Sequence, residues 1–395
     1  MLYVLYAQLR GWLDDAGLLW PFAVLDQLEF RALIALALAF IIVVAFGKKS
    51  IRVLVGLKIG DTGLTDASAL RSVAGSKSNT PTMGGVLIGL AIGLSVFLLA
   101  DIRQAYIQQV LIILVWLGLV GGIDDFLKLT ASTRGAGSRQ GLYAWEKLAA
   151  QLAIGLIIGF FAFRYGDVTP GSDLAHVINL PFQKTYQSSQ GLIADSLFYL
   201  PLVGYVILMM LMTAGMSNAV NITDGMDGLA TGTCAIVAIG LMVLCFIAGE
   251  QMWAQYLLVP YVPGADELTI VAGAMCGACL GFLWWNCSPA MVFMGDTGSL
   301  LLGGIIGYIA IVIRQEFVVL IMCGLFLMEI GSVVIQVGVF KFTRIRTGNG
   351  RRVFKCAPYH HHLHMCGWTE QQVVARLWIV AILFVVAALA SIKLR

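Results

Sequence analysis

Residues 217–229, S-N-A-V-N-I-T-D-G-M-D-G-L, place polar side chains between two apolar runs. The stretch carries the amides Asn218 and Asn221 and the carboxylates Asp224 and Asp227. A carboxylate at the centre of a hydrocarbon layer costs about 2.5–3.5 kcal/mol on insertion scales, so such groups persist mainly where a cation or a charged substrate compensates them. The plainer interpretation is a polar loop that joins two helices.

Four further polar clusters each follow an apolar run. They offer carboxylates, amides, imidazoles and lysines, the side chains that bind phosphates and hard metal ions. Their sequences are T-P-T-M-G-G at 80–85 with Lys77 just before it, G-G-I-D-D-F-L-K at 121–128, G-D-T-G-S-L at 295–300 with Asn286 and Phe293 upstream, and A-P-Y-H-H-H-L-H at 357–364.

The pair Asp124 and Asp125 constrains where a site can lie. Neighbouring residues on a helix point about 100° apart, so both carboxylates face one point only if the site lies between them. Lys128 follows Asp124 by four residues, on the same helix face. An intrahelical salt bridge, worth about 0.3–0.5 kcal/mol, would explain Asp124 and Lys128 but would leave Asp125 without a partner.

The remaining clusters each have a structural alternative. Asp296 immediately precedes an apolar run, where a carboxylate commonly caps a helix. Lys77 and Thr82 lie in a basic segment that either binds phosphate or contacts anionic lipid. The histidine tract, with His360, His361 and His362 at its centre, is an alternative zinc site, but it has no cysteine or carboxylate at ligand spacing within it.

These clusters make more chemical sense together than apart. Two carboxylates 4 Å apart repel by about 4 kcal/mol at an effective dielectric of 20, so converging several aspartates favours a bound cation. Mg²⁺ prefers oxygen ligands, few carboxylates and substrate phosphates. The combination indicates phosphoryl transfer, in which a protein mainly positions its reactants and neutralises their charge.

The composition predicts an all-α integral membrane protein. Of the residues, 59% are hydrophobic and only 12% are charged, against about 25% charged in soluble domains. The net charge of +3 is too small to indicate a nucleic-acid partner, and we expect the C-x-x-C pair Cys276 and Cys279, within an apolar run, to be buried thiols. About ten apolar runs are long enough to span a bilayer. They lie at about 30–47, 83–100, 106–123, 148–165, 197–216, 230–249, 268–285, 298–314, 317–340 and 374–392.

The basic residues predict the orientation in the membrane. About 17 of the 25 lysines and arginines fall in the connections after odd-numbered runs or beside them, which the positive-inside rule assigns to the cytoplasm. We therefore expect one membrane domain, 1–395, with both termini outside and a cytoplasmic site. Segments 1–28 and 166–196 would be periplasmic. The cytoplasmic loops would cover about 48–82, 124–147, 217–229, 286–297 and 341–373.

The ordered set T-P-T-M-G-G, G-x-D-D, N-x-T-D-G-x-D-G-L, G-D-T-G-S-L and A-P-x-H-H-H resembles the phospho-N-acetylmuramoyl-pentapeptide-transferases. These are bacterial polyprenyl-phosphate N-acetylhexosamine-1-phosphate transferases of the glycosyltransferase family 4 type. The resemblance implies transfer of phospho-MurNAc-pentapeptide from UDP-MurNAc-pentapeptide to undecaprenyl phosphate in the bacterial inner membrane, giving lipid I and UMP. It also implies a requirement for Mg²⁺, which Mn²⁺ can replace, and a homodimer.

The resemblance also implies roles for individual residues. Asp296 would bind magnesium with Asp125 and Asp227 nearby, and Asp124 would deprotonate or orient the lipid phosphate. A catalytic role falls to His360. The expected substrate-binding residues are Lys77, Thr82, Lys128, Lys147, Asn218, Asn221, Asp224, Asp227, Asn286, Phe293, His361 and His362.

Three positions depart from the family pattern. His364 stands where an acidic residue is usual, Asn79 where glycine is usual, and 131–140 is longer than the usual connection before Lys147. Two rival functions are a sister transferase that uses UDP-GlcNAc and a cation-coupled transporter. The intact histidine tract favours the muramoyl-peptide donor, and acidic residues at helix ends disfavour a transporter, whose charged groups lie near the bilayer midplane.

Overall fold

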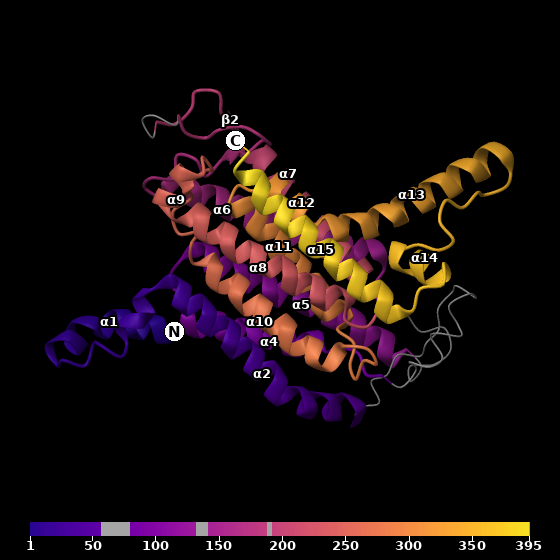
Figure 1. Ribbon diagram of the computed structural model, residues 1–395, viewed down its shortest axis with the longest axis horizontal. Helices are drawn as coiled ribbons and strands as arrows, with labels where there is room; N and C mark the ends of the chain where they lie inside the picture. Colours follow the sequence, from indigo (N-terminus) through magenta and orange to yellow (C-terminus); the bar gives the residue numbers. More distant parts are fainter. Residues whose placement is uncertain (57–79, 132–140, 188–191, 395) are drawn as a thin grey trace.

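The computed structural model describes residues 1–56, 80–131, 141–187 and 192–394. Within these ranges the chain forms a helical bundle with one two-stranded antiparallel sheet beside it (Figure 1). In chain order the elements are α1 (Leu2–Asp15), the 3₁₀ helix η1 (Ala23–Asp26), α2 (Leu28–Gly56), α4 (Gly85–Leu99), α5 (Ala105–Thr130), α6 (Ala144–Val168), β1 (Val177–Ile178), β2 (Phe198–Tyr199), α7 (Leu202–Thr223), α8 (Leu229–Gly249), α9 (Gln251–Tyr256), α10 (Leu268–Asn286), α11 (Gly295–Val312), α12 (Glu316–Met322), α13 (Gly324–Thr347), α14 (Tyr359–Met365) and α15 (Glu370–Ile392).

Nine helices in the described part of the chain are long and apolar enough to cross a membrane. They are α2, α5, α6, α7, α8, α10, α11, α13 and α15. The apolar helix α4 has 15 residues, or about 22 Å, which is shorter than the ~30 Å hydrocarbon core of a bilayer. Each of the ten apolar runs thus contains a helix, and the expectation of an all-α membrane protein is confirmed.

The ninth run, 317–340, is not the single helix that its hydropathy predicts. It divides at Cys323 into α12 and α13. The break falls beside Gly324, where glycine's weak helix preference coincides with tight packing: a Cβ there would lie 2.6 Å from the Phe384 ring of α15. Beyond the break, α13 diverges from the bundle, and the chain then turns back to α14 (Figure 1).

Helix α11 is the most enclosed part of the bundle. Every residue from Asp296 to Val312 is buried, mainly against α7, α5 and α4. A Cβ at Gly303 or Gly307 would lie 2.3 or 2.4 Å from a carbonyl oxygen of α7. Small residues at these positions allow the two helices to approach closely, as is common in membrane bundles. The first turn of α11 is therefore held in a fixed place.

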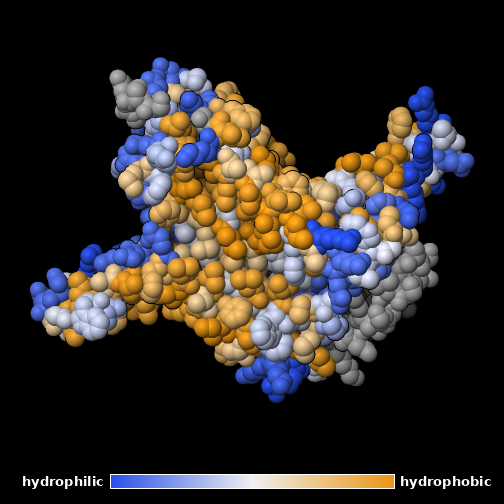
Figure 2. Space-filling view, viewed as in Figure 1, coloured by the Kyte–Doolittle hydropathy of each residue, from blue (hydrophilic) through white to orange (hydrophobic). Residues whose placement is uncertain are grey.

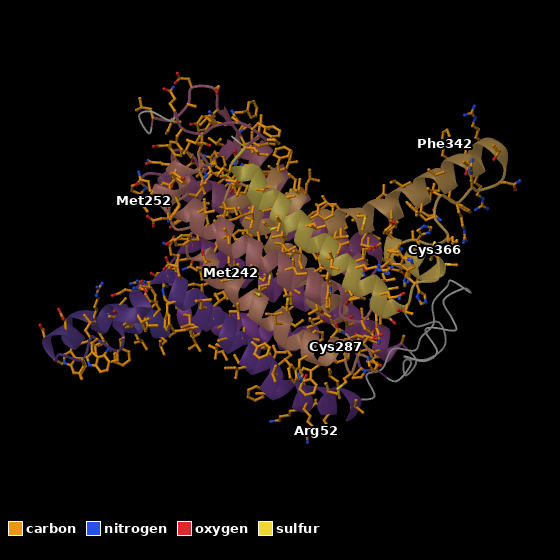
Figure 3. All side chains as sticks on the ribbon, in the orientation of Figure 1. Arg52, Met242, Met252, Cys287, Phe342 and Cys366 are labelled. Carbon is orange, nitrogen blue, oxygen red and sulfur yellow. The ribbon has the colours of Figure 1, made fainter. Side chains whose placement is uncertain are left out.

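The surface matches a membrane-embedded bundle. Figure 2 shows an apolar band across the molecule with hydrophilic residues gathered at its ends. Both chain termini and α9 lie at one end, and α14 lies at the other (Figure 1). In Figure 3 the labelled Met252 marks the first end, while Cys287 and Cys366 mark the second.

The connection 166–196, which carries no diagnostic residue, is partly folded. Its strand β1 pairs with β2 through Val177 opposite Tyr199 and Ile178 opposite Phe198. A small core of Leu174, Val177 and Tyr186 packs beneath it. This connection lies at the end of the bundle that carries the chain termini (Figure 1).

Candidate active site and metal centre

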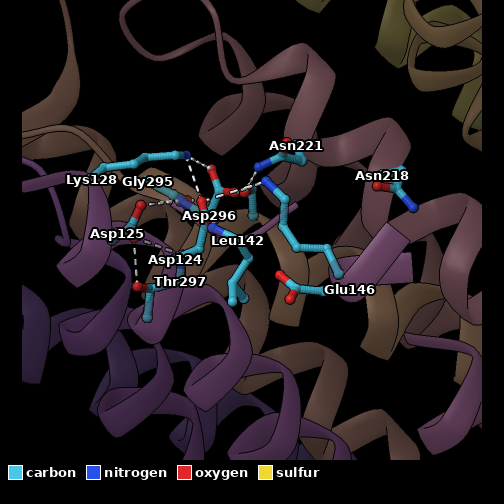
Figure 4. A network of polar contacts seen from close by, with 12 residues as sticks. Asp124, Asp125, Lys128, Leu142, Glu146, Asn218, Asn221, Gly295, Asp296 and Thr297 are labelled. Atoms are coloured by element: carbon cyan, nitrogen blue, oxygen red, sulfur yellow. Dashed lines mark hydrogen bonds and ion pairs between the residues drawn. The ribbon is translucent and has the colours of Figure 1, made fainter. Parts of the chain in front are cut away.

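Three aspartates from two helices meet at the end of the bundle nearest α14. Asp124 and Asp125 lie near the end of α5, and Asp296 lies in the first turn of α11. One carboxylate oxygen from each falls within 4.8 Å of the others, and all three residues are buried (Figure 4). The site therefore lies between Asp124 and Asp125, as their helical spacing required.

Asp125 satisfies the exposed N-terminus of α11. Its Oδ1 accepts the backbone N–H of Asp296 at 3.1 Å, and its Oδ2 accepts the backbone N–H of Thr297 at 3.0 Å. The Thr297 hydroxyl donates to the same Oδ2 at 2.7 Å. The first N–H groups of a helix have no partner within the helix and carry its positive dipole end, so an anion is stabilised there. Asp125 thereby fixes α11 against α5 and fixes Asp296 with it.

Two lysines bridge Asp124 and Asp296 (Figure 4). The Lys128 Nζ lies 2.7 Å from Asp124 Oδ2 and 3.0 Å from Asp296 Oδ1. The Lys147 Nζ lies 2.9 Å from Asp296 Oδ2 and 3.4 Å from Asp124 Oδ2. The backbone N–H of Leu142 donates to Asp124 Oδ1 at 2.7 Å. The intrahelical salt bridge of Lys128 is thus present, and both lysines also reach α11.

Asp224 joins the same cluster from the connection between α7 and α8. The backbone N–H of Gly295, the residue before Asp296, lies near its carboxylate and favours its charged form. Burial raises the pKa of the Asp224 carboxyl to about 7, and the negative charges of Asp296 and Asp125 add to this rise. Asp224 therefore interacts electrostatically with the aspartates at the start of α11.

The charge balance fits a divalent cation. Among the described residues, the three clustered carboxylates of Asp124, Asp125 and Asp296 are opposed by the ammonium groups of Lys128 and Lys147, which leaves one negative charge, to which Asp224 adds when it is ionised. The donors at this point are all carboxylate oxygens, the ligands that hard divalent ions prefer. No histidine of the described chain belongs to a group of three or more potential metal ligands, so the zinc alternative for the histidine tract gains no support.

The loop before α4 is fastened to the loop before α11. The Phe293 N–H donates to the carbonyl of Pro81, and the N–H groups of Gly84 and Gly85 donate to the carbonyls of Phe293 and Met294, at 2.8–2.9 Å. This pairing brings Thr82 beside the site: a Cβ built on Gly295 would lie 2.9 Å from the Thr82 Oγ1. Lys77 and Asn79 lie outside the described residues.

Two predicted substrate-binding residues, Asn286 and Asp227, make contacts that anchor neighbouring segments. Asn286 is buried and accepts hydrogen bonds from the Gly228 N–H and the Thr231 hydroxyl, both at 3.1 Å. Asp227 accepts the Ala290 N–H at 3.1 Å and lies outside the group formed by Asp124, Asp125 and Asp296. Both residues therefore hold the connection 217–229 against the segment that follows α10.

The two amides of α7 also make internal contacts. Asn218 donates to Gln151 of α6 at 2.7 Å, and Asn221 donates to Ser299 of α11 at 2.8 Å. Figure 4 shows Asn221 close to the acidic cluster and Asn218 further from it. Asn221 is the better placed of the two for a ligand bound at the start of α11.

The histidines lie on α14 at the edge of the site. His360 is fully buried, and its Nδ1 lies 3.0 Å from Glu329 of α13. His361 packs beside it with ring centroids 4.2 Å apart. His362 accepts the Lys355 N–H at 3.2 Å, and His364 contacts the Trp368 carbonyl at 2.9 Å. His360 reaches the connection 217–229 at Gly225, where a built Cβ would lie 2.4 Å from its Nε2.

Sequence reasoning missed several contributors. The backbone N–H of Leu142 has no side-chain signal, and the roles of Thr297 and Ser299 were hidden inside the motif G-D-T-G-S-L. Glu329 did leave a signal, because it is a carboxylate within the apolar run 317–340. A charged residue in such a run is rarely without function.

An apolar helical bundle with a buried carboxylate–lysine centre at one end defines a polytopic membrane transferase. The family model for glycosyl transferase family 4 matches residues 107–314, and a phospho-N-acetylmuramoyl-pentapeptide-transferase signature matches residues 77–88.

Curated relatives carry the name phospho-N-acetylmuramoyl-pentapeptide-transferase. The chain is 40% identical to that of Chloroherpeton thalassium over the full length of both proteins. It is 41% identical to that of Chlorobium chlorochromatii over 94% of this chain and 95% of the relative. It is 38% identical to that of Chlorobium limicola over the full length of both. The chain belongs to the phospho-N-acetylmuramoyl-pentapeptide-transferase family.

Asp125→Asn should lower both stability and activity. The amide has only one acceptor oxygen and places an NH₂ group among the N–H donors of α11, which leaves buried donors unpaired at about 1–3 kcal/mol each. We expect a clear fall in the thermal unfolding temperature of the purified protein in detergent. The surface variant Asp15→Asn is the matched control and should melt like wild type. Equal melting of all three proteins would contradict the capping role of Asp125.

Proposed function

We propose that this protein transfers phospho-N-acetylmuramoyl-pentapeptide from UDP-MurNAc-pentapeptide to undecaprenyl phosphate, releasing UMP and forming lipid I, the first membrane step of peptidoglycan synthesis. The observation that carries the proposal is the buried Asp124–Asp125–Asp296 group with its two lysines, at one end of an apolar bundle. The names of the relatives state which group they transfer, phospho-N-acetylmuramoyl-pentapeptide.

The reaction exchanges one phosphoanhydride bond for another. An oxygen of undecaprenyl phosphate attacks the donor phosphorus that bears the sugar. The bond from that phosphorus to the bridging oxygen breaks, and UMP leaves with that oxygen. The sugar phosphate is then joined to the lipid phosphate as a diphosphate. Such a transfer needs in-line positioning and charge neutralisation from the protein.

Mg²⁺ is the proposed cofactor, with Mn²⁺ as a substitute. Asp296 is its foremost ligand in this proposal, because neither of its oxygens is occupied by a backbone N–H. Asp125 and Asp227 complete the proposed set. The Asp125 carboxylate already accepts three hydrogen bonds, so its role in this proposal is mainly to position α11. When bound, the ion supplies positive charge that stabilises the phosphate oxygens during transfer.

Lys128 and Lys147 are proposed to change partners when substrates bind. Each ammonium group now sits between Asp124 and Asp296. The phosphate groups of the two substrates are anionic acceptors that offer the lysines alternative partners. The exchange would free Asp124 to orient or deprotonate the lipid phosphate. Because Lys128 is nearly half exposed, its ion pairs are weak enough to break.

The proposed uridine and donor contacts surround this centre. Asn221, Asp224 and Phe293 border the uridine, while Lys77, Thr82 and Asn286 assist with phosphates or their positioning. Asn218, which lies further from the acidic cluster, is the more distant of the proposed donor-binding residues. His361 and His362 line the side of α14 where the sugar and peptide lie. The half-buried positions of Thr82, Phe293, His361 and His362 leave them accessible to a ligand.

The site is proposed to face the cytoplasm, with both termini in the periplasm. Basic residues favour this orientation, because Lys48, Lys49 and Arg52 lie toward the end of α2, and Arg344 and Arg346 lie in the last turn of α13. A site at the membrane edge lets a lipid held in the bilayer meet a soluble nucleotide. A homodimer in the inner membrane is proposed from the family alone.

The donor distinguishes this proposal from its nearest rival. Purified protein in undecaprenyl-phosphate liposomes should release UMP with UDP-MurNAc-pentapeptide and show at least about 100-fold lower kcat/KM with UDP-GlcNAc, a difference of about 2.7 kcal/mol. Turnover of UDP-GlcNAc alone would instead assign the sister transferase. Cation-driven solute uptake without UMP release would assign the transporter.

Asp296→Asn should abolish divalent-metal-dependent UMP release while the protein remains folded. The amide removes one negative charge from the cluster and one of the two Asp296 oxygens that could bind the ion, so we expect a loss of at least about 10³-fold in kcat, or about 4 kcal/mol. Asp173→Asn, on the connection at the opposite end, is the matched control. Retained turnover with an unchanged response to Mg²⁺ would argue against Asp296 as a ligand.

A further inference from the structure

A buried carboxylate–imidazole pair, Glu329 and His360, lies near the acidic cluster, and its carboxylate has no part in the reaction described so far. Glu329 is in α13 and His360 is in α14, and both side chains are fully buried. Few ionisable groups are buried to this extent unless they are paired. The pair joins the helix that diverges from the bundle to the helix that carries the histidine tract.

Glu329 makes two contacts to His360. Its Oε2 lies 3.0 Å from the ring Nδ1 and 3.3 Å from the backbone N of the same residue. An ionised carboxylate has no proton to donate, so the Nδ1 must carry the proton in this contact. A hydrogen bond at one ring nitrogen fixes the tautomer and the ring orientation. The other ring nitrogen, Nε2, is thereby left as the group that can act on a ligand.

The Nε2 atom of His360 points at the connection between α7 and α8. It is buried and has no hydrogen-bond partner among the described residues. A Cβ built on Gly225 would lie 2.4 Å from it, so only glycine leaves room for the ring here. Gly225 adjoins Asp224, whose carboxyl interacts electrostatically with Asp296 and Asp125. The free nitrogen therefore lies against the residue next to an aspartate that borders the acidic cluster.

We propose that Glu329 is a positioning residue that holds His360 with its Nδ1 protonated and its Nε2 presented to the nucleotide-sugar substrate. The inference rests on the proposed function of the site. His360 Nε2 would accept a hydrogen bond from a hydroxyl or amide of the donor, or, when protonated, donate one to its diphosphate. Glu329 touches no substrate and acts only through the ring.

A purely structural role for Glu329 has a different signature. The carboxylate also accepts the His360 backbone N–H in the first turn of α14, where helix N–H groups need partners. Both contacts use the same oxygen, Oε2, so Glu329→Gln places either an uncharged, weaker acceptor or an NH₂ group against both donors. The NH₂ group would present an N–H to Nδ1 and favour the other tautomer. The double variant with His360→Gln separates ring orientation from helix capping, because the backbone N–H of residue 360 remains when the ring is replaced.

The test compares wild type, Glu329→Gln, His360→Gln and the double variant by UMP release in undecaprenyl-phosphate liposomes, with the exposed Glu29→Gln as control. We expect Glu329→Gln to lower kcat/KM by about 10- to 100-fold, the usual effect of removing a carboxylate that orients a functional histidine. In the His360→Gln background it should lower kcat/KM by less than about twofold, because its effect passes through the ring. Glu29→Gln should match wild type.

Two kinetic results would overturn the proposal: unchanged kcat/KM in Glu329→Gln, or losses that multiply in the double variant. Absence of UMP release by wild type would instead overturn the proposed function. A tautomer measurement does not depend on how well Glu329→Gln folds. Nitrogen NMR of the ¹⁵N-labelled histidines should show a protonated Nδ1 that disappears in His360→Gln, beside that of His364, whose Nδ1 faces the Trp368 carbonyl. Assignment of a bare Nδ1 to His360 would refute the positioning role.

Discussion

The first turn of α11 begins with backbone N–H groups that no residue of its own helix can satisfy. Asp125 of α5 accepts those of Asp296 and Thr297, and the carboxylate of Asp224, after α7, lies near that of Gly295. The rest of α11 is wholly buried and cannot shift without disturbing the bundle. This single helix terminus therefore fixes where two other segments of the chain place their carboxylates.

Several carboxylates at one point repel one another and lose hydration, and the protein compensates this with more than one kind of interaction. The helix dipole and backbone N–H groups stabilise Asp125 and Asp224, and Lys128 and Lys147 compensate Asp124 and Asp296. The negative charge that remains makes the site receptive to a divalent cation and, through it, to phosphates. Because the cluster lies at one end of the apolar band, a lipid phosphate can reach it without leaving the bilayer.

Much of this arrangement could be predicted from the sequence. Long apolar runs give the helices, and aspartates at their ends with short connections place the charges on a common face. The exact partners could not be predicted in this way. Asp125 and Asp227 look equivalent in the sequence, yet the first caps α11 and the second binds the Ala290 N–H. That difference depends on helix crossings, such as the close contact of Gly303 and Gly307 with α7, which no local pattern encodes.

The central claim is that Asp124, Asp125 and Asp296 form one centre that holds a divalent ion against the nucleotide phosphates. Electron paramagnetic resonance of Mn²⁺ added to the purified protein with UMP tests it most directly. The account predicts one saturable ion per chain with coupling to a phosphorus nucleus of UMP, lost when the three aspartates are replaced together by asparagine. A bound ion that persists in that triple variant, or one without phosphorus coupling, would contradict it.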